Sequence, residues 1–187
     1  MSGTAYFIKE DGAKVSFPIA PQPLEFKEVE KIVEEIPTRE GFQTVVRVCE
    51  SLQGSPGVRL WDGSENNATI LWPASSSYGS PEDYAAKMVL GLYFDPTPRN
   101  LELFYLLHEL GHIKDMERKG ARRYYCLSAA EDQRWRGFTN KRLGFHWLRY
   151  IGQIAYMLLP LERQATKYAL GWMKDYARLN DPSPSSR

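Results

Sequence analysis

Histidine and cysteine are scarce in this 187-residue chain, which contains three histidines and two cysteines. Cys49 and Cys126 lie far apart and form no CxxC pair, which excludes a disulfide-dense fold and suits a reducing, cytoplasmic location. No apolar run approaches the roughly 18 residues that indicate a membrane-spanning helix. Residues 1–10 lack the pattern of a secretory signal, so we expect no membrane association.

Neither sign of charge is in excess. The 24 Lys and Arg residues nearly balance the 23 Asp and Glu residues, and the net charge is +1. A protein with this balance gives no reason to expect a nucleic-acid partner. The hydrophobic fraction of 43% and the charged fraction of 25% are those of an ordinary globular protein. We therefore expect one domain over residues 1–180 and a flexible tail over 181–187.

Residues 1–40 are expected to form an N-terminal hairpin followed by a helix. Ala5–Lys9 and Lys14–Ile19 are rich in aromatic and branched residues and flank an Asp-Gly turn, as in a β-hairpin. Leu24–Ile36 has apolar residues at spacings of three and four, which indicates an amphipathic helix. Pro37 is expected to end this helix.

The middle of the chain is expected to be rich in strands. Val58–Trp61 and Thr69–Trp72 are short apolar runs separated by turn-forming residues, and Gly91–Asp95 also resembles a strand. Thr44–Cys49 fits a strand or a helix. Residues 82–90 fit a short helix or the approach to a strand.

The second half of the chain is expected to be helical. Asn100 is a suitable N-cap for a long helix that ends near Gly120. Three further helices are expected at about Leu127–Arg134, Phe145–Leu159 and Leu161–Leu179. The fold class that follows is α+β, with a small β-sheet packed on several helices and the long helix central.

The long helix carries the motif His108-Glu109-Leu110-Gly111-His112, which has the form HExxH. Residues at i and i+4 lie one turn apart on one face of a helix, so both imidazoles can bind one zinc ion. Glu109 lies beside them, where it can act as general base toward a metal-activated water and then protonate the leaving amine. The motif therefore predicts a zinc metallopeptidase.

Gly111 interrupts an otherwise apolar helix. A glycine inside a helix costs about 1 kcal/mol relative to alanine. We expect another segment to approach the helix closely at this position.

A third protein ligand is needed, and the sequence offers two carboxylates. No third histidine follows in metzincin spacing, and His146 lies elsewhere. Glu162 begins the last expected helix. Glu131 follows His112 with eighteen residues between them, the spacing of thermolysin-like gluzincins. Both candidates remain open on spacing alone.

Residues 90–175 resemble the gluzincin-type metallopeptidases of the ImmA/IrrE family. Besides HELGH, the segment from Glu162 to Ala169 is similar to the family's second signature, ExEAN-x-FA, with Gln164 in place of its second glutamate. Thr166 replaces the Asn or Asp that supports a histidine in that family. The gap between the two signatures is longer here, which implies an inserted helix.

The resemblance implies a zincin-like domain in which Glu162 is the third zinc ligand. It also implies a cytoplasmic, regulatory protease of narrow specificity, acting on a protein or peptide substrate that in this family is often a repressor. One alternative is a zinc-containing binding module of a phage or toxin–antitoxin system without proteolysis. Another is a DNA-associated protease of the SprT kind.

Two supporting features remain hypotheses. In zinc peptidases of this architecture an edge strand pairs with the extended substrate, and the strand Ala68–Trp72 is the candidate for this role. A side chain that stabilises the oxyanion is also expected. The candidates, by residue type alone, are Tyr124, Tyr125, His146 and Tyr156.

Overall fold

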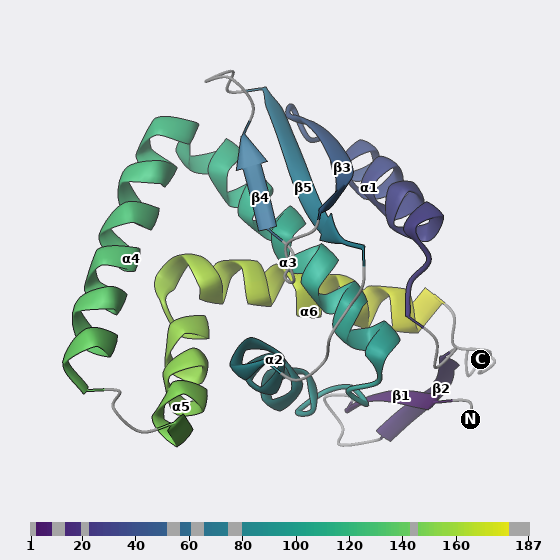
Figure 1. Ribbon diagram of the computed structural model, residues 1–187. Coiled ribbons are helices and arrows are strands. Elements are labelled where there is room, and N and C mark those ends of the chain that lie inside the picture. Colours follow the sequence, from purple (N-terminus) through teal and green to yellow (C-terminus); the bar gives the residue numbers. More distant parts are fainter. Residues whose placement is uncertain are drawn as a thin grey trace.

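The computed structural model describes residues 3–8, 14–19, 23–51, 57–60, 66–74, 80–142 and 146–179. The chain is helical in its second half, with two small sheets in its first half (Figure 1). The elements in chain order are β1 (Gly3–Ile8), β2 (Lys14–Ile19), α1 (Phe26–Glu40), β3 (Val45–Ser51), β4 (Gly57–Leu60), β5 (Asn67–Pro73), α2 (Pro81–Leu90), α3 (Pro98–Lys119), α4 (Ala121–Arg142), α5 (His146–Met157) and α6 (Pro160–Leu179).

The predicted N-terminal hairpin is present, and the two apolar runs of the middle segment form paired strands. Strands β1 and β2 pair antiparallel, with Gly3 opposite Ile19. Strands β4 and β5 also pair antiparallel, with Val58 opposite Ile70. The Asp-Gly turn of the first hairpin and the predicted tail over 181–187 lie outside the described residues.

The three-stranded sheet has the order β3-β5-β4, and β3 runs parallel to β5. The ambiguous segment Thr44–Cys49 therefore contributes a strand, because Val45 to Ser51 extend along β5. The expectation that Ala68–Trp72 is an edge strand is wrong. This segment belongs to β5, whose two edges are occupied by β3 and β4.

Helix α1 runs through Pro37, contrary to the sequence expectation. It begins with a capping box between Glu25 and Glu28 and ends at Gly41, whose φ of 64° closes the C-terminus. Pro37 lies in the last turn of the helix and is buried. A proline with helical φ removes only one backbone donor, so the helix continues to Glu40.

The expected strand Gly91–Asp95 is a turn between α2 and α3. The amide of Gly91 donates to the carbonyl of Lys87 and that of Phe94 donates to Leu90, which prolongs helix-like hydrogen bonding. The N-cap of α3 is Thr97 rather than Asn100. Pro98 fits the first helical position, so the cap is the residue before it, three residues before Asn100.

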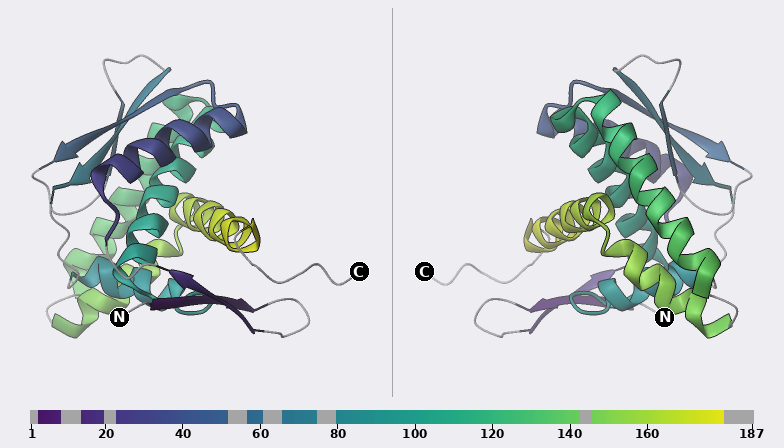
Figure 2. Two further views of the ribbon diagram at one scale, coloured as in Figure 1. Left: turned by 90° about the vertical axis from the view of Figure 1, so that its right-hand side faces the viewer. Right: turned by 90° about the vertical axis from the view of Figure 1, so that its left-hand side faces the viewer.

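Helix α3 is buried around most of its circumference. Figure 2 shows the three-stranded sheet and α1 packed on one side of α3 and α6 crossing it on another. Alternate residues of β5 face this core, among them Ala68, Ile70 and Trp72. Helix α6 contributes Leu161, Ala165, Ala169 and Met173, a stripe with one residue every four positions.

Two helices separate α3 from α6 along the chain. Helix α4 is longer than expected and follows Gly120, whose φ of 81° ends α3. Helix α5 packs against α2 and leads back to α6 (Figure 1). Cys49 and Cys126 are both free and exposed. Within the part of the chain that the structure describes, no helix combines the length and hydropathy needed to cross a membrane.

Candidate metal centre

Helix α3 places the two histidines of the HExxH motif beside each other. His108 and His112 are one turn apart, and their Nε2 atoms are 3.1 Å apart. The ring planes are nearly perpendicular, at 87°. The two rings are therefore not stacked, and both Nε2 atoms face the same point in space.

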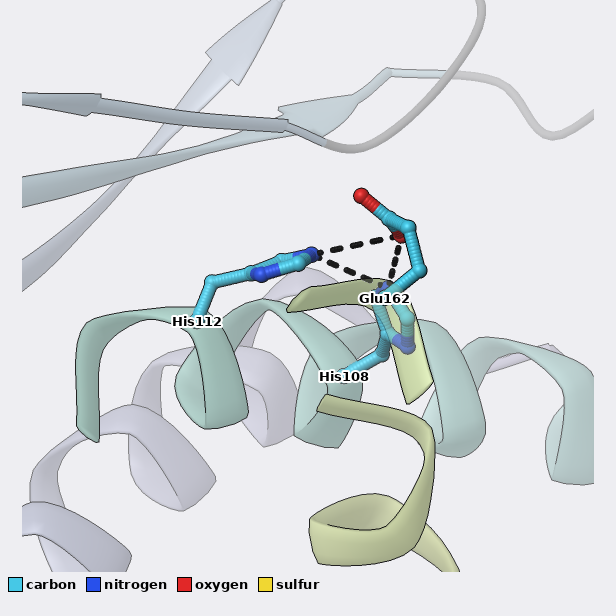
Figure 3. Close-up of side chains that lie close together, drawn as sticks. All are labelled: His108, His112 and Glu162. Atoms are coloured by element: carbon cyan, nitrogen blue, oxygen red, sulfur yellow. Dashed lines mark hydrogen bonds and ion pairs between the residues drawn. The ribbon is translucent and has the colours of Figure 1, made fainter. Parts of the chain in front are cut away.

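Glu162 brings a carboxylate to the same point from α6. Its Oε2 lies 3.0 Å from Nε2 of His108 and 3.5 Å from Nε2 of His112. Figure 3 shows the two imidazoles and the carboxylate converging. Glu162 lies in the first turn of α6, where the positive end of the helix dipole favours a carboxylate.

The three side chains form a group that could hold a metal ion. In a tetrahedral site with bonds of about 2.0–2.1 Å, two ligand atoms lie about 3.3 Å apart. The observed separations of 3.0, 3.1 and 3.5 Å bracket this value. All three side chains are at least 85% buried, since their exposed fractions are 9%, 14% and 15%. The donor set of two imidazoles and one carboxylate suits a divalent transition metal.

A close approach of α3 and α6 makes this convergence possible. A Cβ atom at Gly111 would lie 2.9 Å from Cα of Ala165 and 3.1 Å from Cβ of Tyr168. The sequence-based expectation that another segment approaches Gly111 is therefore confirmed. The glycine lets α6 approach α3 one turn from Glu162.

The second ring nitrogen of each histidine also has a partner. Nδ1 of His112 lies 2.7 Å from the Tyr124 hydroxyl, and Nδ1 of His108 lies 3.4 Å from Oγ1 of Thr166. When Nε2 binds a metal, Nδ1 carries the proton and donates it to such an oxygen. Thr166 thus lies beside a histidine, at the position where the resembled family has a supporting Asn or Asp. Tyr124 contacts the other histidine.

Glu109 lies between the two histidines in sequence and is partly buried. Burial raises the pKa of its carboxyl group, while the neighbouring His112 and His108 oppose this rise. Among the described residues, its carboxylate has no hydrogen-bond partner or ion pair. The group is therefore not held by a competing contact.

The charges of the triad's side chains influence one another. Burial alone would raise the pKa of Glu162, but hydrogen bonds from His108 and His112 hold it well below its ordinary value. Burial would likewise lower the pKa of His112, yet the hydrogen bond to Glu162 and the nearby carboxylates raise it. The carboxylate of Glu162 and the imidazole of His112 thus each favour the charged form of the other.

Glu131, the other candidate ligand, is not part of the triad. Its Oε2 accepts a hydrogen bond of 3.3 Å from the amide of Leu161, which precedes Glu162. Glu131 therefore caps the first turn of α6 from α4. The eighteen-residue spacing does not bring its carboxylate into the group of His108, His112 and Glu162, and α4 leads the chain away from α3 (Figure 1).

Of the other residues expected to stabilise an oxyanion, only Tyr156 lies next to a member of the triad among the described side chains. Burial and the negative charge of Glu162 raise the pKa of Tyr156, which also hydrogen-bonds to that carboxylate. Tyr125 is exposed and stacks edge-on against Tyr124. His146 is the first residue of α5, and its side chain lies outside the described part of the structure.

Comparisons with known proteins give no further guide to this site. No protein-family model, curated protein or solved structure matches the chain.

Proposed function

We propose that the protein is a zinc-dependent metallopeptidase of the gluzincin type, with a zincin-like fold. The observation that carries the proposal is the convergence of His108, His112 and Glu162, with Glu109 next to the first histidine. In this arrangement three side chains hold the ion and a fourth is available for proton transfer. This is the division of roles in catalytic zinc sites, where one coordination position stays open.

Zinc fits the donor set better than a hard cation does. Calcium and magnesium prefer six or more oxygen ligands, whereas two imidazole nitrogens and one carboxylate are typical of catalytic zinc. When bound, zinc lowers the pKa of a water molecule and polarises the carbonyl group of a substrate.

The residues of the chain itself supply positioning and proton transfer. Glu109 accepts a proton from the attacking water and delivers it to the leaving amine. Burial raises the pKa of this carboxyl group, and a raised pKa makes a carboxylate a stronger base toward the attacking water. Tyr124 and Thr166 orient the histidine rings through their Nδ1 atoms. Tyr156, beside Glu162, can donate a hydrogen bond to the developing oxyanion.

The resemblance to the ImmA/IrrE family supports the finer part of the proposal. The enzyme would be a narrow-specificity, regulatory peptidase that acts in the cytoplasm. Its substrate would be a protein or peptide, and a repressor protein is one candidate. Two helices, α4 and α5, lie between the two signatures in the chain, as the long gap between them implies.

The experiment that tests the proposal measures metal and hydrolysis in the same preparations. Wild-type protein is reconstituted with zinc, its zinc content is determined, and a proteome-derived peptide library is searched for cleavage by mass spectrometry. Glu109→Gln is the matched variant, since it removes the base without touching a ligand. We expect about one zinc ion per chain in both proteins and cleavage by the wild type alone.

Three results would contradict the proposal in different ways. If wild-type protein binds no zinc after reconstitution, the proposed metal site is wrong. If zinc is bound but no peptide is cleaved, the protein is a metal-binding module without hydrolysis. If cleavage persists in Glu109→Gln, the proposed hydrolysis by Glu109 is wrong.

A further inference from the structure

Helix α4 turns an unusual face toward the rest of the protein. Its partly buried residues recur at helical spacing: Tyr124, Ser128, Glu131, Asp132 and Trp135. A helix that packs on a core normally shows an apolar stripe there. Among the described side chains of α4 only Ala121 is buried, and of the residues on this face only Tyr124 packs against the hydrophobic core.

The polar face of α4 lines a pocket of about 280 Å³. Helix α5 contributes Tyr156 to the pocket, and α6 contributes Leu161 and Glu162. Because Glu162 belongs to both, the pocket adjoins the candidate metal centre. We call it the α4 pocket.

The lining of the α4 pocket combines apolar surface with negative charge. Leu159, Leu161 and Ala129 provide the apolar part, and Glu131 and Asp132 provide carboxylates in addition to Glu162. No lysine, arginine or histidine is among the described residues that line it. One oxygen of Glu131 accepts from the Leu161 amide, and its other oxygen has no partner within the described part of the chain.

We propose that the α4 pocket binds a lysine or arginine side chain of the peptide substrate, next to the bond that is cleaved. The inference rests on the proposed function, because it takes the metal centre as the place of cleavage. It adds a substrate class, which is a peptide with a basic residue beside the scissile bond.

The chemistry of a basic side chain matches both parts of the lining. Its methylene stem packs against apolar residues while its charged end remains among polar groups. The charged end meets Glu131 and Asp132, and a guanidinium can form charge-assisted hydrogen bonds with a carboxylate. The ring faces of Tyr124, Tyr125 and Tyr156 also attract a cation. An acidic side chain would meet like charges, and a neutral one would gain no charge interaction with Glu131 and Asp132.

The test measures binding rather than cleavage. The probes are N-acetyl-arginine amide and N-acetyl-citrulline amide, which have nearly the same shape but differ in charge. Each is titrated into ¹⁵N-labelled, zinc-loaded Glu109→Gln protein, and amide chemical shifts report the dissociation constant and the site. We expect arginine to bind about tenfold more tightly than citrulline, with the largest shifts in α4 and at the start of α6.

Glu131→Gln is the decisive variant. Its side-chain oxygen can still accept from the Leu161 amide, so the capping contact is kept and only the charge is lost. We expect the preference for arginine to fall severalfold. The matched control is Glu30→Gln, an exposed position of α1, which should leave it unchanged. Asp132→Asn repeats the test at a second position should Glu131→Gln fail to fold.

The outcomes separate this inference from the proposed hydrolysis. Equal binding of the two probes, shifts away from the α4 pocket, or a preference that survives loss of the charge would overturn it, even for an active peptidase. Preferential arginine binding at α4 would support the pocket even in a preparation that cleaves no peptide.

Discussion

Oε2 of Glu162 lies 3.0 Å from Nε2 of His108, although 54 residues separate the two in the chain. Two elements that are distant in sequence thus form one group of ligand atoms. The contact identifies Glu162, rather than Glu131, as the carboxylate that joins the HExxH histidines. The consequences can be measured.

Loss of Glu162 should remove the metal while loss of charge at Glu131 should not. We expect Glu162→Ala to bind less than a tenth as much zinc at a limiting ion concentration, because one of three ligands is gone. Glu131→Gln should retain about one ion per chain, since its carboxylate contacts the Leu161 amide and is not part of the triad. Zinc content after dialysis against a calibrated chelator gives the comparison. Equal retention by both variants would show that Glu162 is not a ligand.

Tyr124→Phe should weaken metal binding through the orientation of His112. Partners of this kind are worth about 10- to 100-fold in affinity, and the hydroxyl lies 2.7 Å from Nδ1. Thr166→Val should have a smaller effect on His108, because its contact is 3.4 Å. Tyr125→Phe is the control, since this neighbouring ring is exposed. Competition with a fluorescent zinc indicator gives the dissociation constants. Identical values for the two tyrosine variants would contradict the orienting role.

Gly111→Ala should destabilise the fold, in spite of the better helix propensity of alanine. The new methyl group would meet the backbone of Ala165 at 2.9 Å, and such overpacking costs about 1–3 kcal/mol. Gly171→Ala is the matched control in α6, where nothing lies within 4 Å of the added carbon. It should leave the free energy of unfolding unchanged or raise it by up to about 1 kcal/mol. Urea unfolding of both variants tests the difference. A neutral Gly111→Ala would mean that α3 and α6 are further apart than described.

The contact between α1 and α3 should weaken at low pH. Arg99 holds the pKa of Glu28 below its usual value of 4.5, through a bidentate pair with distances of 2.6 and 3.1 Å. A lowered carboxyl pKa stabilises the fold above 4.5, and the gain is lost as pH falls through the folded-state pKa. Since the Glu28 side chain is 40% exposed, the gain is under about 1 kcal/mol.

Arg99→Met should therefore lose more stability at about pH 6 than at about pH 3. Urea unfolding at both values measures this difference. Glu28→Gln should remove most of it, because the titrating group is then absent. A destabilisation by Arg99→Met that is independent of pH would show that the pair contributes no charge interaction.

Much of the candidate site could be predicted because local spacing determines it. His108 and His112 lie on one face as soon as their segment is helical, and Gly111 indicates close packing whichever segment packs there. Glu162 could only be ranked above Glu131 by resemblance. Its contact with the histidines depends on how α6 returns past two intervening helices, which no local pattern specifies.

The contact between Tyr124 and His112 could not be read from the sequence. The chain has eleven tyrosines, and residue type alone does not separate them. Only the direction of α4 after Gly120 brings this hydroxyl to His112. A periodicity argument would have found the polar face of α4, but not what it encloses.

The errors in the fold prediction have a common origin in neighbouring structure. Gly91–Asp95 has strand-like composition, yet the hydrogen bonds of the preceding helix extend into it. The segment Ala68–Trp72 was expected at an edge, but the parallel partner β3 covers that side. Parallel pairing joins segments without a short turn, so the sequence between them does not reveal it.

The triad also connects two parts of the chain that are made far apart in time during synthesis, since α3 emerges well before α6. An ion bound by all three side chains would bind the folded chain but hardly the unfolded one, and would stabilise the fold by about 2.7 kcal/mol at one hundred times its dissociation constant. The amount of folded protein in a cell would then follow the supply of free zinc. Zinc starvation would limit the lifetime of the protein as well as its chemistry.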